Sequence, residues 1–308
     1  MVQIREYLNI VSKRKLLYTL FLLAIALPIN AQVSKAKHIV LIGCDGFGAY
    51  ALPEADMPNL KKLMETGAWS LKARSVLPSS SAVNWASMLM GASPTLHGYT
   101  EWGSKTPEIP SADTTTYKLF PSIFSVIRQQ KKQSVTAAVY SWPGIGHLIE
   151  KDAITKVIPT NDNEDLCLKE AVKVIQEEKP LFTFIHFDEP DHTGHEIGHR
   201  TPAYYTKLKE VDQRIGEIVN AVKAAGIADE TIIILSADHG GKDKGHGGKS
   251  LDEVQIPWVI NGVGIKKGHE IKDVIITYDT AATIAWILGL DTPQSWRGKA
   301  VLSAFGMK

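Results

Sequence analysis

The feature that most constrains this chain is a regular alternation of short apolar runs with amphipathic segments from His38 onward. Nearly continuous apolar runs rich in β-branched residues, typical of buried strands, occupy 38–44, 135–140, 181–187, 231–237 and 257–260. Helical patterns occupy 58–65, 84–90, 122–130, 165–178, 202–225 and 279–288. Because strands separated by helices need crossover connections, the sequence predicts an α/β fold with a mostly parallel central sheet and helices on both faces.

Residues 1–31 have the composition of a secretory signal peptide. Lys13, Arg14 and Lys15 precede an apolar run at 16–27, and the segment closes with Ala31. A charged region, a short apolar core and a small final residue mark such a signal. The apolar run is shorter than the roughly 20 residues of a membrane span, so an uncleaved anchor is the less favoured alternative. We therefore expect export, with no membrane span left after cleavage and a single domain over 32–308.

Charge and cysteine content exclude several classes of protein. The chain has 34 Lys+Arg and 33 Asp+Glu, and removing the four basic residues and one acidic residue of 1–31 turns its formal net charge from +1 to −2. Without a basic surplus, binding to nucleic acid chiefly by phosphate neutralisation is excluded. Two cysteines are too few for a disulfide framework. Cys44 and Cys167 are expected to be buried free thiols rather than a pair.

Acids and histidines follow three of the predicted strands. Asp45 comes directly after the first strand, the segment 188–195 follows the third, and Asp238 and His239 follow the fourth, with His246 close behind. In a parallel sheet ligands bind beyond the carboxyl ends of the strands, so these side chains are expected to meet. Asp and neutral His are ligands that zinc favours, and the neighbouring glycines allow close approach. Each motif alone would indicate a turn or a helix cap, but together they predict a metal site.

The order and spacing of these motifs resemble the alkaline-phosphatase superfamily, and within it the type I phosphodiesterase/nucleotide pyrophosphatase branch. The similarity runs from His38 to about Ala304. It implies an alkaline-phosphatase-like three-layer sandwich and a catalytic role for 32–308. It also implies two divalent metal ions, expected to be zinc. The resemblance assigns one ion to Asp45, Ser81, Asp238 and His239, and the other to Asp191, His195 and His246.

That branch carries a hydroxyl nucleophile in a Pro-x-x-Thr/Ser segment, three residues before an Asn. The matching segment here runs from Pro78 to Asn84, so the resemblance points to Ser81, with Ser79 and Ser80 as alternatives in a Ser-rich turn. A serine at a helix N-terminus is activated by the helix dipole and by a metal, which both favour an incoming phosphate. A Ser-His-Asp triad is disfavoured because no Gly-x-Ser-x-Gly segment is present.

The chain departs from its nucleotide-processing relatives 21 residues after Ser81, where they usually carry an Asn that holds a phosphoryl oxygen and this chain has Trp102. Asn84 or the Ser81 backbone N–H is left as the expected oxyanion donor. Trp85, Trp102 and Trp142 fall in or near the irregular stretches predicted at 92–120 and 141–163. Stacking on a sugar or base and packing in the core both stay open for them.

A rival interpretation comes from His195 to His199, which match the His-Glu-x-x-His signature of zinc proteases. Pro190 and Gly194 before the motif, and Pro202 after it, argue against the helix which that chemistry needs. A sulfatase is disfavoured because the Ser-rich turn lacks a Cys/Ser-x-Pro-x-Arg motif.

The favoured expectation is an exported two-metal phosphohydrolase that acts on a small-molecule phosphoester, with phosphodiesterase ahead of phosphomonoesterase or phosphotransferase. The resemblance implies a phosphoseryl-type intermediate on Ser81. The alternative of another class is a non-catalytic, zinc-stabilised binding protein.

Overall fold

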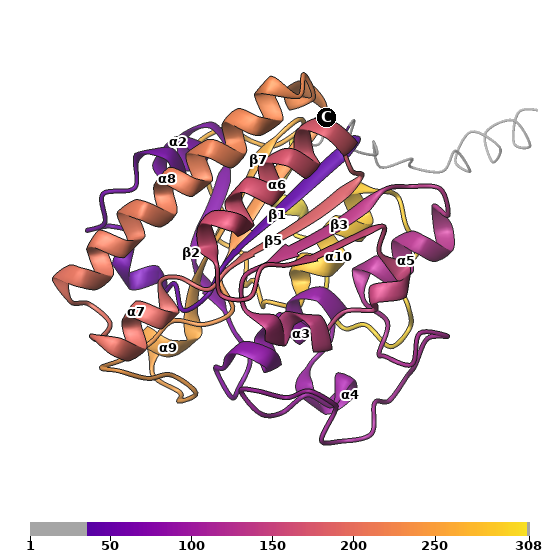
Figure 1. The fold of residues 1–308 in the computed structure, drawn as a ribbon, viewed down its shortest axis with the longest axis horizontal. Coiled ribbons are helices and arrows are strands. Elements are labelled where there is room, and N and C mark those ends of the chain that lie inside the picture. The colour runs from indigo at the N-terminus through magenta and orange to yellow at the C-terminus, as the bar shows by residue number, and fades with distance from the viewer. Residues whose placement is uncertain (1–35, 307–308) are drawn as a thin grey trace, which may run out of the picture. The chain divides into compact units, whose positions relative to one another are not determined.

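The computed structural model describes residues 36–306, and a single eight-stranded sheet runs through them (Figure 1). The strands are β1 (His38–Cys44), β2 (Ala68–Arg74), β3 (Thr136–Tyr140), β4 (Lys156–Pro159), β5 (Phe182–Phe187), β6 (Thr231–Ser236), β7 (Gln255–Gly262) and β8 (His269–Glu270). Their order is β4-β3-β5-β1-β6-β7-β2-β8. β7 is antiparallel to its neighbours β6 and β2, while the other neighbours pair in parallel. The predicted mostly parallel sheet is confirmed.

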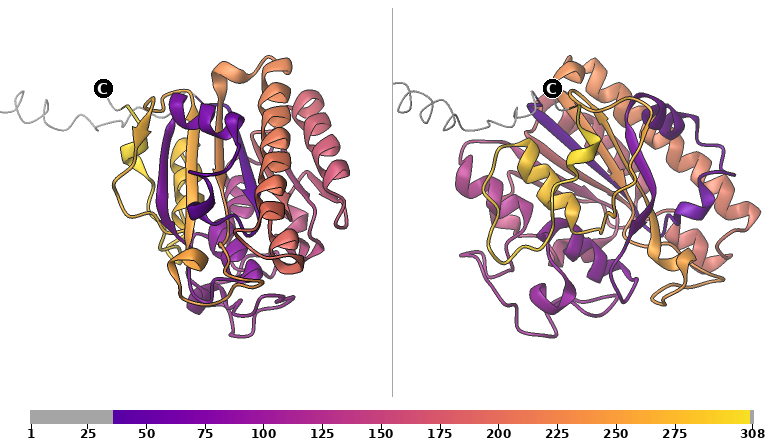
Figure 2. Two further views of the ribbon diagram at one scale, coloured as in Figure 1. Left: turned by 90° about the vertical axis from the view of Figure 1, so that its left-hand side faces the viewer. Right: turned by 180° about the vertical axis from the view of Figure 1, so that it is seen from behind.

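Helices cover both faces of this sheet, as predicted. They are α2 (Pro58–Thr66), α3 (Ser81–Met90), α4 (Pro94–His97), α5 (Ile123–Gln130), α6 (Glu164–Glu178), α7 (Asp191–Glu196), α8 (Pro202–Ala224), α9 (Leu251–Val254) and α10 (Asp279–Ile287). α8 packs against α2 and α6 on one face, and α10 packs against α3 and α5 on the other (Figure 2). No helix in 36–306 is long and apolar enough to cross a membrane.

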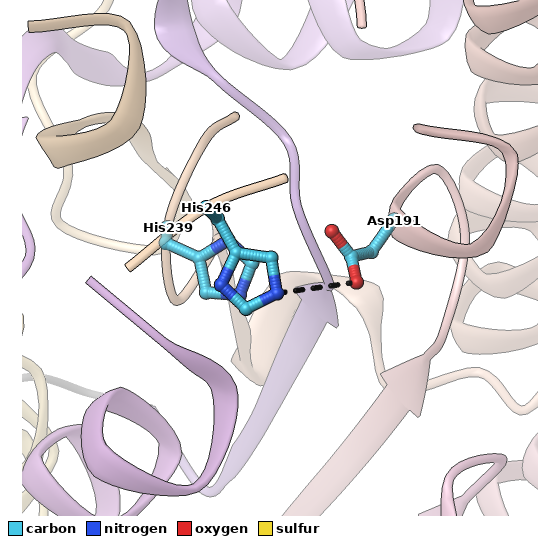
Figure 3. A group of neighbouring side chains, drawn as sticks. All are labelled: Asp191, His239 and His246. Carbon is cyan, nitrogen blue, oxygen red and sulfur yellow. Dashed lines mark ion pairs between the residues drawn. The ribbon is translucent and has the colours of Figure 1, made fainter. Parts of the chain in front are cut away.

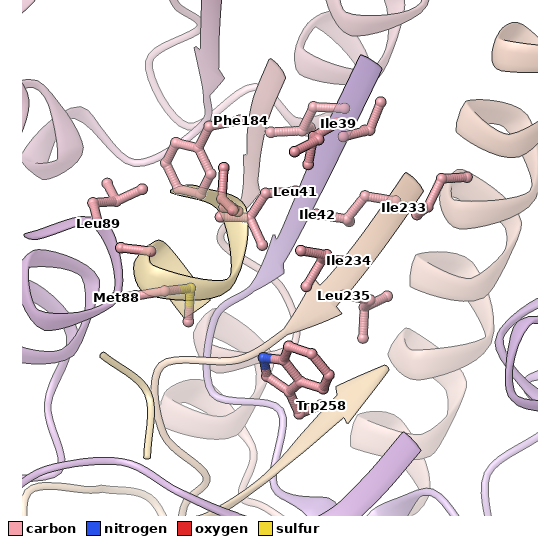
Figure 4. Close-up of a cluster of buried hydrophobic side chains, with 14 of the residues drawn as sticks. Ile39, Leu41, Ile42, Met88, Leu89, Phe184, Ile233, Ile234, Leu235 and Trp258 are labelled. Carbon is pink, nitrogen blue, oxygen red and sulfur yellow. The ribbon is translucent and has the colours of Figure 1, made fainter. Parts of the chain in front are cut away.

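The core forms around β1 and β6, whose apolar runs leave no polar face. Successive residues of a strand point to opposite faces, and Figure 4 shows Ile233 and Leu235 on one side of β6 and Ile234 on the other. All three are buried, and each such side chain contributes about 1.5–3 kcal/mol by leaving water. β1 lies between β5 and β6, with Gly43 opposite His186 of β5 and Ser236 of β6. This register brings the carboxyl ends of the three strands to one edge.

Helix α3 is the element that delivers the Ser-rich turn to this edge. It begins at Ser81, three residues before the predicted start, because Ser80 is extended and serves as the N-cap. All ten of its residues are buried, and none of them carries a charge. It ends at Gly91, whose φ of 59° is left-handed. A Cβ there would lie 2.5 Å from the Trp296 ring, so both the conformation and the space require glycine.

Several elements escaped prediction. β2, β4 and β8 lie at or near the sheet edges and carry polar residues such as Lys156, so they lack a continuous apolar run. β4 falls inside the stretch 141–163, which the sequence suggested was irregular. α7 was not predicted because it has no apolar stripe, since its residues lie at the candidate site rather than packing in the core. Cys44 and Cys167 are free and buried, as expected. The expected signal at 1–31 lies outside the described residues.

Candidate active site

The predicted convergence at the sheet edge occurs, with His239 at the centre of a first group of side chains. Asp45 follows β1, Asp238 and His239 follow β6, and Ser81 opens α3. Nε2 of His239 lies 3.1 Å from Oδ2 of Asp238 and 3.4 Å from Oδ1 of Asp45. The same nitrogen lies 3.2 Å from Oγ of Ser81. The four residues that the resemblance assigned to one metal are therefore brought together.

The second expected group forms around Asp191, which follows β5 and opens α7. Its Oδ2 lies 3.2 Å from Nε2 of His195 and 3.8 Å from Nε2 of His246. Figure 3 shows His239 and His246 side by side, with His246 directed toward Asp191. The two imidazole rings stack with centroids 3.8 Å apart. Ligand atoms of Asp191, His239 and His246 lie within 4.8 Å of one another, so the two groups adjoin.

Asp45 is held by two core residues that sequence reasoning did not assign to the site. The indole N–H of Trp85 donates to Oδ2 of Asp45 at 2.9 Å, and Nε2 of His186 lies 3.2 Å from the same oxygen. The Trp85 and His186 rings meet edge to face. Trp85 is thus a core residue rather than a substrate wall. The sequence feature that could have indicated His186 is that it is a lone histidine in the apolar strand β5. Together with Asp45 and Asp188 it forms a further group of candidate metal ligands.

Gly46 lets the two groups approach each other. Its φ is 67°, and a Cβ would lie 2.5 Å from Oδ1 of Asp191, so a side chain here would push the Asp191 carboxylate away. The Gly46 N–H donates to Oδ1 of Asp238 at 3.2 Å. The Tyr204 hydroxyl donates to the Gly46 carbonyl at 2.8 Å and anchors this turn to α8.

The electrostatics of the cluster fit a bound cation. Oδ1 of Asp45, Oδ1 of Asp191 and Oδ2 of Asp238 are buried without hydrogen-bond partners. Burial, together with repulsion from Asp45 and Asp191, raises the pKa of Asp188 to about 8 and that of Asp238 well above its usual range. Burial lowers the pKa of His246 to about 4, which leaves it neutral and able to ligate. Carboxylate oxygens without hydrogen-bond partners beside imidazole nitrogens are the donor set of a divalent metal such as zinc.

The three serines of the turn have different surroundings. Oγ of Ser79 donates to the carbonyl of Gly248 at 2.7 Å, and Ser80 is the N-cap of α3. Of the three hydroxyls, the structure places that of Ser81 next to His239. As the first helical residue, Ser81 has a backbone N–H without a partner inside its own helix.

The structure corrects the expected role of Asn84 as an oxyanion donor. Its buried side-chain amide donates to the carbonyls of Val76, Pro78 and Ser80, and its Oδ1 accepts from the Val76 N–H at 2.7 Å. Both amide protons are therefore committed to the backbone of the preceding turn. Asn84 shapes the turn that carries Ser81, and the Ser81 N–H is left as the expected donor.

Two cavities open onto these groups. The smaller, of about 170 Å³, is lined by Ser81, Trp102, Trp142 and the residues of the second group. The larger, of about 520 Å³, is lined by Pro78, Glu101 and Trp102 together with His195 and His246. Trp102 is 65% exposed and borders both. Of the three tryptophans singled out in the sequence, Trp102 and Trp142 therefore face the cavity above Ser81.

The protease signature is not assembled. α7 ends at Glu196, so His199 lies beyond the helix that would have to carry both histidines. The ring of His199 is buried between Gly194 and Gly241, where a Cβ at either glycine would collide with it. Glu196 is exposed and pairs with His192 at 3.3 Å. This Glu is thus turned to solvent rather than placed as a base.

Comparison with known proteins finds a family whose profile matches most of this chain. The profile of the family "Type I phosphodiesterase / nucleotide pyrophosphatase" matches residues 39–252. A venom phosphodiesterase of Macrovipera lebetinus is 28% identical over 214 residues, covering 66% of this chain and 25% of the relative. The bis(5'-adenosyl)-triphosphatase enpp4 of Mus musculus is 28% identical over 225 residues, covering 68% of this chain and 48% of the relative. The chain thus spans between a quarter and about half of the length of these relatives.

Among solved structures, murine ectonucleotide pyrophosphatase/phosphodiesterase 5 in complex with AMP superimposes with a TM-score of 0.73 at 15% identity. The match covers 88% of this chain and 100% of the solved one. At this identity the likeness shows a shared fold, and that fold is alkaline-phosphatase-like.

Proposed function

Because this chain belongs to the type I phosphodiesterase/nucleotide pyrophosphatase family of the alkaline-phosphatase superfamily, we propose that it is a metal-dependent phosphoric ester hydrolase with Ser81 as nucleophile. A phosphodiester is the favoured substrate. The observation that carries the proposal is the position of the Ser81 hydroxyl. It sits at the N-terminus of α3, 3.2 Å from His239, in a site with three buried carboxylate oxygens that have no hydrogen-bond partner.

Two sets of side chains would hold two cations, which we propose to be zinc. Asp45, Ser81, Asp238 and His239 form one set, and Asp191, His195 and His246 form the other. When bound, the cations supply positive charge that offsets the buried carboxylates and polarises the phosphoryl group. The hydrogen bond to Asp191 raises the pKa of His195 to about 9, so a cation held by this set would have to displace a proton from His195.

The reaction uses the chain's own groups as follows. Oγ of Ser81 loses its proton to solvent and forms a bond to phosphorus, while the bond from phosphorus to the departing ester oxygen breaks and that oxygen takes up a proton from water. The Ser81 backbone N–H and the N-terminal end of α3 face the negative charge on the phosphoryl oxygens. Trp85 and His186 keep Asp45 in place during this step. Water then breaks the bond between Oγ and phosphorus, which releases the phosphate with its remaining ester group and restores Ser81.

We also propose that the protein is exported. The charged and apolar pattern of residues 1–31 supports this, as do the words "venom" and "ectonucleotide" in the names of its relatives. A phosphomonoesterase or phosphotransferase on the same scaffold is the second candidate, because Trp102, where the nucleotide-processing relatives usually have Asn, counts against a nucleotide substrate.

The test is metal analysis and hydrolysis with purified zinc-loaded protein, using bis(4-nitrophenyl) phosphate and 4-nitrophenyl phosphate. We expect about two zinc ions per chain. The Ser81→Ala variant should keep metal at the other positions and lose hydrolysis by about a thousandfold or more. Ser79→Ala, in the same turn, is the matched control and should remain active. Undiminished hydrolysis by Ser81→Ala would reject the nucleophile, whereas zinc binding without hydrolysis of either ester would favour the binding protein.

A further inference from the structure

A backbone hydrogen bond connects Trp102 with the residue that follows the nucleophile. The N–H of Ala82, the residue after Ser81, donates to the Trp102 carbonyl at 3.1 Å. The indole is 65% exposed and borders both the cavity above Ser81 and the larger one beside it. Because the bond uses the carbonyl, the position of this loop does not depend on which side chain residue 102 carries.

The loop that carries Trp102 is held by one carboxylate. Oε2 of Glu108 accepts hydrogen bonds from the Thr100 N–H at 2.8 Å and from Oγ of Ser104 at 2.9 Å. The Ser104 hydroxyl in turn accepts from the Glu101 N–H at 3.1 Å. These bonds fix the backbone on both sides of Trp102, so the exposed indole projects from a well-defined segment of the main chain.

The larger cavity has a distinctive charge pattern. Its volume of about 520 Å³ has room for a ring-sized group. Glu101 is the acidic residue of its lining, and among the described residues that line it there is neither Lys nor Arg. A phosphate group placed beside Glu101 would meet its carboxylate, and the described lining residues offer neither Lys nor Arg to offset that charge. A flat uncharged ring would instead stack on Trp102 and contact Pro78.

Building on the proposed function, we propose that Trp102 and Glu101 form a specificity subsite for the organic group of the ester. The group it takes is a flat, uncharged ring that bears no phosphate beyond the scissile one. Trp102 supplies the stacking surface, and Glu101 disfavours anionic groups such as the further phosphates of a nucleoside polyphosphate. The substrate class is therefore aryl and other ring-bearing phosphoesters.

The experiment measures calorimetric binding of three phosphonates to the zinc-loaded protein: methylphosphonate, phenylphosphonate and 4-carboxyphenylphosphonate. All three share the phosphonate head and differ in ring and charge. Phenylphosphonate should bind about tenfold or more tightly than methylphosphonate, since stacking on an aromatic side chain contributes an effect of this size. The added carboxylate should weaken binding relative to phenylphosphonate.

Variants separate the contributions of the two residues. Trp102→Ala should abolish most of the preference for phenyl over methyl, and Trp102→Phe should restore part of it. Glu101→Gln should reduce the penalty for the carboxylated ring. Ile109→Ala is the control, because Ile109 is an exposed apolar residue of the following segment that does not line the cavity, and it should keep the preference.

The outcomes distinguish this proposal from the one on which it rests. If methylphosphonate binds and esters are hydrolysed, but the preference for the ring is missing or survives in Trp102→Ala, the subsite proposal is wrong and the proposed function stands. If none of the phosphonates binds and no ester is hydrolysed, the proposed function itself fails.

Discussion

Asp45 illustrates at the scale of one residue how the site is assembled. Its Oδ2 is fixed by the Trp85 N–H and faces His186, while its Oδ1 has no hydrogen bond and lies 3.4 Å from Nε2 of His239. One oxygen of the carboxylate thus contacts buried core residues, and the other lies among the candidate metal ligands. Outer partners of this kind orient a ligand before the metal arrives.

The Trp85→Phe substitution should therefore weaken metal binding. It removes the N–H that fixes Asp45 but keeps an aromatic ring beside Phe184 and His186. We expect the zinc affinity to fall by about tenfold or more, as for other outer-shell groups. Competition with a chelator of known affinity measures this, and Trp286→Phe, whose ring packs on Phe305, is the control. An unchanged affinity in Trp85→Phe would show that the indole does not hold Asp45 in place.

Much of the site was predictable from single residues, because Asp45, Asp238 and His239 directly follow strong apolar strands. The roles of Trp85 and His186 were not predictable. They depend on the pairing of β1 with β5 and on the packing of α3, which join residues up to 141 positions apart. Asn84 was misassigned because the resemblance placed it near the nucleophile, whereas its hydrogen bonds go to the preceding turn.

At the scale of elements, helix α3 controls where the nucleophile lies, and its C-terminal end is fixed by Gly91. The Gly91→Ala variant should be destabilised by both the left-handed backbone and the collision with Trp296. Gly226→Ala is a matched control, since Gly226 has a φ of 71° and no neighbour within 4 Å of a Cβ.

The control should lose about 1 kcal/mol of unfolding free energy from backbone strain alone. Gly91→Ala should lose about 1–3 kcal/mol more, because the Trp296 ring has to shift. Urea unfolding of both variants measures the difference. Equal losses would mean that the contact with Trp296 relaxes freely and does not position α3.

The elements that could be predicted best from the sequence are those whose residues are mostly buried in the core. β1 and β6 are buried almost throughout, so their apolar runs identified them. The edge strands β4 and β8 consist of partly exposed residues, apart from the exposed Pro159 that closes β4, and such short polar strands form because a neighbour supplies hydrogen bonds. The sequence of α7 shows no apolar stripe at helical spacing, because Asp191 and His195 point into the site.

At the scale of the whole molecule, a net charge close to zero coexists with a strong local excess of acidic side chains. The chain has a formal net charge of +1, yet Asp45, Asp188, Asp191 and Asp238 converge at one edge of the sheet. Attraction for a phosphoester therefore depends on the bound cations rather than on the overall charge. Removing metal with a chelator is therefore expected to abolish activity.

Global stability should depend on pH through His97, which is buried against Ser87 and Tyr99. Burial lowers its pKa from 6.5 to about 3. The folded protein thus excludes a proton that the unfolded chain binds below pH 6.5. The contribution of neutral His97 is full above that pH and is lost as the pH falls toward 3, by up to about 1.4 kcal/mol per pH unit.

Unfolding by denaturant at pH 7 and pH 5 checks this dependence. His97→Gln keeps hydrogen-bonding groups near Ser87 but cannot be protonated in this range. Between the two pH values the variant should lose about 1–2 kcal/mol less stability than the unsubstituted protein. Identical losses would contradict the assignment of a neutral, buried His97.

Ser81 should carry a covalently bound phosphoryl group during turnover. The most direct measurement is peptide mass spectrometry of zinc-loaded protein, acid-quenched while it hydrolyses bis(4-nitrophenyl) phosphate. We predict a 4-nitrophenyl phosphoryl group on Oγ of Ser81 in the peptide that carries the turn, absent from the Ser81→Ala variant, which should also be inactive. A phosphoryl group on Ser79 or Ser80, or hydrolysis by Ser81→Ala at the rate of the unsubstituted protein, would contradict it.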